Sequence, residues 1–85
     1  MSKLQKTKDK LLNTAQVFTF KDLEYLLGKF NYVEKKTGKT SGSRIAFIQI
    51  NSNHIIRLHK PHPDNDLKKY VRNYIIQELK NQDLL

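Results

Sequence analysis

Histidine and arginine are the residues of this 85-residue chain best suited to chemistry, and all of the His and two of the three Arg lie in its middle third. All three His residues lie between residues 31 and 63, where six Lys or Arg accompany a single acid, Glu34. His59 and His62 sit close together in the run 58–63. Imidazole titrates near neutral pH and suits proton transfer, whereas Lys and Arg hold phosphate. The pattern predicts a site for a polyanion, of which nucleic acid is the commonest.

Metal and thiol chemistry have little support in the sequence. There is no Cys, which excludes disulfides, zinc-thiolate sites and thiol catalysis. Only Asp64 and Asp66 lie near His59 and His62 as companion ligands, so we expect no metal and no cofactor. For each of these two His residues taken alone, a chemical role is no better supported than a structural one, in which one His hydrogen-bonds a loop carbonyl and the other is solvated. The sequence presents no Ser–His–Asp grouping and no close pair of carboxylates. Any hydrolysis would therefore be metal-independent, which RNA permits because its 2′-hydroxyl is an internal nucleophile.

The run Thr37-Gly38-Lys39-Thr40 is similar to the end of a phosphate-binding loop. That motif needs a Gly at the position of Val33 and a helix after the loop, and here a strand is expected to follow. Nucleotide binding is therefore not expected. Two interpretations remain, a solvated hairpin loop or a basic loop that contacts phosphate through Lys39 and backbone N–H groups.

Length and composition set the class of protein. Eighty-five residues allow one hydrophobic core, and a net charge of +8 with 38% hydrophobic residues indicates a basic chain that folds. No stretch approaches the roughly 20 apolar residues of a membrane span, and no signal peptide is visible. We therefore expect a cytoplasmic protein without a membrane partner.

Hydrophobic periodicity predicts helices at both ends and strands between them. The first helix is expected over residues 2–15, and the second begins at a Thr19 cap, with Asp22 three residues on, and ends near Asn31. The last helix is expected over 67–83, with Lys68, Lys69 and Arg72 grouped near its start and off its apolar stripe. Strands are expected over 32–36, 43–50 and 54–60, joined by links short enough to make both pairings antiparallel.

This order predicts an α+β fold, a three-stranded antiparallel sheet with helices on one face and an additional N-terminal helix. Successive side chains along a strand point to opposite faces of the sheet. If Phe47, Ile56 and Leu58 face the helices, then Arg44, Arg57 and His59 point away from the core and form a positive open face.

The run from Phe20 to Leu79 resembles the HicA-type toxins of bacterial toxin–antitoxin systems. The matching features are Leu26-Leu27 near a helix end, Gly42-Ser43-x-x-x-Phe47 in a strand, Pro61-x-Pro63 after the third strand, and Asp66-Leu67-Lys68 before the last helix. The resemblance implies a fold like the double-stranded-RNA-binding domain over residues 19–85, with residues 1–18 as a helical extension. It also implies an endoribonuclease that cleaves mRNA and is neutralised by a cognate antitoxin protein.

One position departs from the family pattern. The family has its catalytic His directly after Gly-Ser, where this chain has Arg44. Arg stays protonated and cannot act as an ordinary base, but it can hold a phosphate and stabilise developing charge. Proton transfer would then fall to His59, favoured by strand parity, or to His62, which matches a His that many family members carry in this loop; otherwise catalysis is lost. The residues expected to contact nucleic acid are Lys39, Ser43, Arg57, Lys60, Lys68 and Lys69.

Two further functions stay open on the sequence. Arg44 in place of the family His favours binding over chemistry, so a non-catalytic RNA-binding module is one alternative. The other is a small interaction protein whose basic face meets an acidic antitoxin. The favoured function is an RNA-binding toxin with metal-independent endoribonuclease activity.

Overall fold

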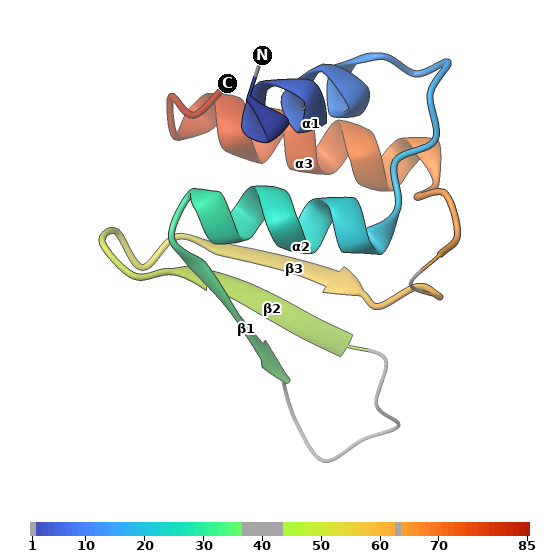
Figure 1. Cartoon of the computed structure of the whole chain (residues 1–85). Helices are drawn as coiled ribbons and strands as arrows, with labels where there is room; N and C mark the ends of the chain where they lie inside the picture. The colour runs from blue at the N-terminus through green and yellow to red at the C-terminus, as the bar shows by residue number, and fades with distance from the viewer. Residues whose placement is uncertain (1, 37–43, 63) are drawn as a thin grey trace.

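The computed structural model describes residues 2–36, 44–62 and 64–85 and has the α+β architecture expected from the sequence. The elements of that part of the chain are, in order, α1 (Lys3–Leu12), α2 (Phe20–Lys29), β1 (Tyr32–Lys36), β2 (Arg44–Gln49), β3 (Ile55–His59) and α3 (Lys69–Asn81). The helices lie on one side of the sheet, with α1 and α3 side by side and α2 against the strands (Figure 1). The finer likeness to a double-stranded-RNA-binding domain stays a prediction.

The start of α2 is fixed by reciprocal hydrogen bonds. Thr19 Oγ1 accepts from the Asp22 N–H at 3.2 Å, and the Asp22 carboxylate accepts from the Thr19 N–H at 3.0 Å. This is the capping box expected from the sequence, with Asp in place of Glu. After the helix, Asn31 adopts φ 68°, the left-handed backbone that an Asn tolerates. The chain thereby reverses directly into β1.

The three strands form one antiparallel sheet in the order β1-β2-β3. Each strand begins and ends within one residue of its predicted position. Asn53, with φ 59°, lies in the tight turn between β2 and β3. In the resulting register Arg44 lies opposite His59, and Phe47 lies opposite Ile56.

One face of the sheet is buried beneath the helices. Ile45, Phe47 and Ile56 are almost completely buried, and the Phe20 ring of α2 packs 6.1 Å from the Phe47 ring, centroid to centroid. The same core contains residues from all three helices: Leu11, Leu23, Leu26, Leu27, Ile75 and Leu79. Leu11 belongs to the segment expected to be an extension, so α1 contributes to the core of the domain.

Arg72 is the main departure from the expected helix α3. The sequence grouped it with Lys68 and Lys69, yet its side chain is buried. Its guanidinium donates to four backbone carbonyls just after α1 or in its last turn, those of Lys10, Leu11, Asn13 and Gln16. Arg72 therefore caps the C-terminal end of α1, where the helix dipole and the free carbonyls favour a cation.

Candidate nucleic-acid interface

The uncovered face of the sheet is basic at one end. The pairing places Lys35, Ala46 and Arg57 in one row across the strands, and Arg44 and His59 in the next. Alternation along each strand puts all of these side chains on the face opposite Phe47. Arg44, Arg57 and His59 are exposed, as the sequence predicted for an open face.

Arg44, Arg57 and His59 meet around a small hollow of about 340 Å³. Arg44 and His59 occupy directly opposed positions on β2 and β3, so their Cβ atoms start roughly 4.5–5.5 Å apart. Arg57 is two residues before His59 on the same face. Two arginines and one histidine therefore line a hollow large enough for a phosphate group. Within the described residues, the His59 imidazole makes no hydrogen bond that would fix its orientation.

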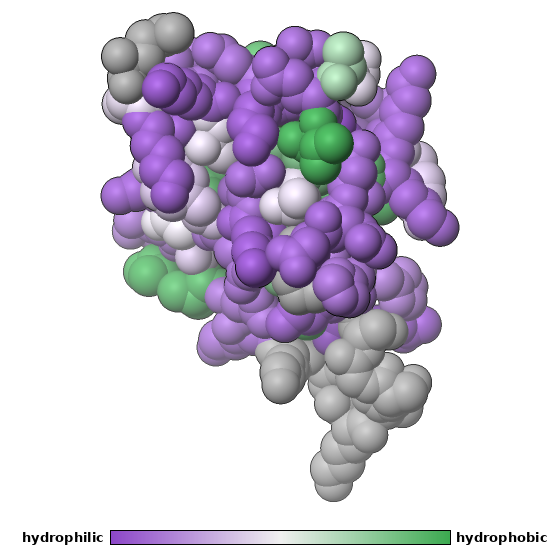
Figure 2. All heavy atoms as spheres, turned by 45° about the vertical axis from the view of Figure 1, so that its right-hand side comes forward, coloured by the Kyte–Doolittle hydropathy of each residue, from purple (hydrophilic) through white to green (hydrophobic). Residues whose placement is uncertain are grey.

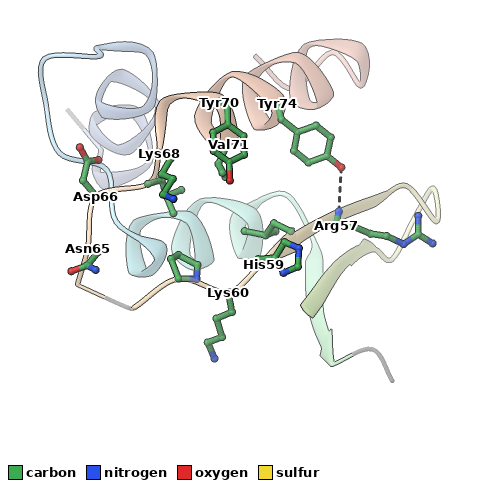
Figure 3. A pocket seen from close by; sticks show the side chains of 12 residues that line it. Arg57, His59, Lys60, Asn65, Asp66, Lys68, Tyr70, Val71 and Tyr74 are labelled. Carbon is green, nitrogen blue, oxygen red and sulfur yellow. Dashed lines mark hydrogen bonds between the residues drawn. The ribbon is translucent and has the colours of Figure 1, made fainter. Parts of the chain in front are cut away.

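A larger groove of about 500 Å³ lies beside the hollow, between β3 and α3 (Figure 3). Arg57 and His59 border it from β3, and Lys68 borders it from the start of α3. Lys60 also lines the groove, but its ammonium lies 5.4 Å from the Phe20 ring centroid and 3.8 Å from the Glu34 carboxylate. Lys60 thus reaches toward the helix side of the sheet and is partly neutralised there.

The other expected site residues are placed less centrally. His62 is exposed, and its Nδ1 accepts from the Asp64 N–H at 3.3 Å. Lys69 is exposed in the first turn of α3, next to the cap residue Lys68. Lys39 and Ser43 lie outside the described residues, as does the Thr37–Thr40 run. Seen from the side where β3 ends and α3 begins, the surface is mostly hydrophilic with small hydrophobic patches (Figure 2).

The open face changes character toward the other end of the strands. Val33, Ile48 and Ile55 lie opposite one another across β1, β2 and β3, and Val33 is 40% exposed. Ile50 is two residues after Ile48, so it points to the same face, and it is 64% exposed. The face is therefore half basic and half apolar, and only the basic half carries groups suited to phosphate.

One hydrogen-bonded cluster was missed by the sequence reasoning. The Tyr32 hydroxyl hydrogen-bonds His54 Nδ1 at 2.6 Å, and His54 Nε2 lies 3.4 Å from the Glu78 carboxylate. Burial, with a smaller contribution from Glu78, raises the pKa of Tyr32, so its hydroxyl stays protonated. The cluster joins β1, the β2–β3 turn and α3. Its members are far apart in the sequence, and they come together only through the pairing of the strands and the packing of α3.

A pair of carboxylates was also missed. The sequence predicted no close pair, but Glu24 of α2 lies beside Glu34 of β1. Partial burial and the neighbouring Glu34 carboxylate raise the pKa of Glu24, while Lys60 and Lys21 oppose the shift. The pair lies on the helix side of the sheet, away from Arg44 and His59, and so stands apart from the basic hollow.

Neither a metal centre nor a membrane span is found among the described residues. Across 2–36, 44–62 and 64–85, no three His, Asp or Glu side chains come together as metal ligands would. None of the helices in that part of the chain has the length and apolar character needed to cross a bilayer.

Comparison with known proteins gives no relative. The chain matches no family model, no curated protein and no solved structure. The resemblance to HicA-type toxins therefore stays a prediction that rests on the sequence motifs.

Proposed function

We propose that this protein binds RNA and cleaves it without a metal ion, as a HicA-type toxin whose partner is a cognate antitoxin. The observation that supports the proposal best is the opposition of Arg44 and His59 across β2 and β3, with Arg57 beside them. This arrangement gathers two phosphate-binding cations and one proton-transfer group around a single hollow. Its substrate would be cytoplasmic mRNA.

The roles follow from the chemistry of each side chain. Arg44 and Arg57 would hold the scissile phosphate and stabilise the charge that develops when the 2′-hydroxyl attacks phosphorus. His59 would accept the 2′-hydroxyl proton or donate one to the leaving 5′-oxygen. The bond to that oxygen breaks as the new bond forms, leaving a 2′,3′-cyclic phosphate and a 5′-hydroxyl end.

His59 is favoured over His62 for proton transfer. His59 lies on the same face as Arg57 and opposite Arg44, whereas His62 lies three residues beyond β3 and turns one ring nitrogen to the Asp64 N–H. The family match of His62 supports the opposite assignment. Single variants of the two residues therefore separate the geometric argument from the argument by resemblance.

A non-catalytic RNA-binding module is the second candidate. It is favoured by Arg44 at the position of the family His, and by the His59 ring, which no hydrogen bond from another described residue orients. A positioned base is normally held by such a bond. The basic hollow would then bind phosphate without accelerating its transfer.

Mapping new 5′ ends in cellular RNA after induced expression tests the proposal. Wild-type protein should generate ends bearing 5′-hydroxyl groups, and the His59→Ala variant should generate few at equal protein level. New ends carrying 5′-phosphate would contradict the metal-independent route. An absence of new ends under growth arrest, with RNA still copurifying, would favour the binding module.

A further inference from the structure

The outer edge of β3 carries backbone groups that pair with no strand of the described sheet. β3 is an edge strand in the order β1-β2-β3. The Gln49 N–H donates to the His54 carbonyl, which fixes which residues of β3 face β2. By that alternation, Ile55, Arg57 and His59 direct their N–H and C=O groups away from β2. The Arg57 N–H indeed donates outward, to Tyr74 Oη of α3 at 3.2 Å (Figure 3).

The groove beside this edge has an apolar wall and a basic rim. Its apolar lining comes from both sides: Leu58, Pro61, Leu67, Tyr70, Val71 and Tyr74. Tyr70 leaves 70% of its surface exposed although it is a large aromatic side chain. Covering such a surface is favourable, because each Å² of apolar area removed from water contributes about 25 cal/mol of free energy.

The charged residues that border the groove determine whether it favours an acidic or a basic occupant. Arg57, His59, Lys60 and Lys68 border it, and Asp66 is the one acid among its lining residues. Asp66 is already engaged, since its carboxylate accepts from the Phe18 N–H at 2.9 Å and lies 3.6 Å from the Arg72 guanidinium. Lys60 is partly neutralised by Glu34, so Arg57 and Lys68 leave a surplus of positive charge at the border of the groove.

We propose that the groove between β3 and α3 binds an extended, acidic segment of a partner protein, which adds to the sheet as a strand beside β3. A peptide backbone supplies alternating acceptors and donors to Arg57 and His59, as strand addition requires, and one of its carbonyls would replace Tyr74 Oη as the acceptor of the Arg57 N–H. Residues of the segment that face α3 would be apolar, and those that face the basic rim would be Asp or Glu. Nucleic acid would be attracted to the positive rim, but it does not supply the alternating backbone partners that the N–H and C=O groups of the strand edge require.

A second copy of this chain is a poorer occupant. Its described strands carry Lys35, Lys36, Arg44 and Arg57 against a single acid, Glu34, so pairing with β3 would bring like charges together. Strand addition at this edge does not depend on RNA cleavage, because it uses the backbone of β3, although the Arg57 and His59 side chains border both the groove and the basic hollow.

Selection from a displayed library of random ten-residue linear peptides on the immobilised full-length protein tests the proposal. Selected sequences should be enriched in Asp and Glu alternating with apolar residues. The highest-affinity synthetic peptide should shift the amide resonances of residues 55–60 and 68–74. The same peptide with N-methyl groups at alternate residues on one edge should bind at least tenfold more weakly, because it loses the backbone donors.

Two matched charge reversals locate the site. Lys68→Glu should weaken binding of the selected peptide at least tenfold, whereas Lys80→Glu, on the exposed last turn of the same helix, should leave the affinity within about twofold. The proposal is overturned by selected peptides without acidic enrichment, by equal binding of the N-methylated peptide, or by shifts confined to other elements. It is equally overturned if oligouridine RNA shifts the groove resonances and no peptide does so.

Discussion

Replacing Arg72 by Met should destabilise the fold by about 3 kcal/mol. Met keeps an apolar stem of similar length but removes the guanidinium that joins α3 to the end of α1. Four carbonyls lose a charged donor, and each such bond contributes roughly 1.5–3 kcal/mol. Rehydration of the carbonyls and relief of the buried charge offset much of that sum. For a domain of this size, about 3 kcal/mol corresponds to a fall in Tm of roughly 12–24 °C.

Urea unfolding followed by circular dichroism measures this change as a shift in the transition midpoint. Lys80→Met, an exposed position on the same helix, is the matched control and should stay within about 0.5 kcal/mol of the wild type. Hydrogen exchange should show that α1 loses protection first in the Arg72→Met variant. A cost under about 1 kcal/mol, with α1 still protected, would refute the role assigned to this guanidinium.

Three further perturbations have defined outcomes. Arg44→His should raise single-turnover RNA cleavage, since a general base then occupies the position where the family has one; unchanged cleavage by a folded variant would show that the positions do not correspond. Tyr32→Phe should cost about 1 kcal/mol in urea unfolding, because the His54 ring loses a buried partner, and an unchanged midpoint would contradict that bond. Burial alone would raise the pKa of Asp22, but hydrogen bonds from Thr19 and Lys10 outweigh it and hold that pKa below its usual range. The stability from Asp22 is therefore present above its unfolded-state pKa and lost as the pH falls through the lowered folded-state pKa, so Asp22→Asn should flatten the acid limb of the stability–pH profile.

Local signals in the sequence were sufficient for the elements and for the faces of the sheet. Thr19 and Asp22 predicted the start of α2 because a capping box involves neighbours in the chain. Alternation in β2 and β3 predicted that Arg44, Arg57 and His59 share the open face, and the register places them around one hollow. These inferences needed only the two-residue repeat of side chains along a strand and the 3.6-residue repeat along a helix.

Long-range contacts could not be predicted in the same way. The burial of Arg72 depends on where α1 ends relative to α3, which no local pattern specifies. Lys60 follows β3 by one residue, and its turn toward Glu34 depends on the pairing of β1 with β2. The Tyr32–His54 bond likewise arises from tertiary packing between distant segments.

Single-turnover cleavage of a structured RNA, with binding measured alongside, tests the proposed function at its core. Wild-type protein freed of any antitoxin should cleave in the presence of chelator, with a pH dependence near the pKa of an imidazole. His59→Ala should reduce the rate by roughly 10²–10⁴-fold while RNA affinity, set by Arg44 and Arg57, changes little. Equal rates for the wild type and His59→Ala, or no cleavage by folded wild-type protein that still binds RNA, would contradict the enzyme and leave the binding module.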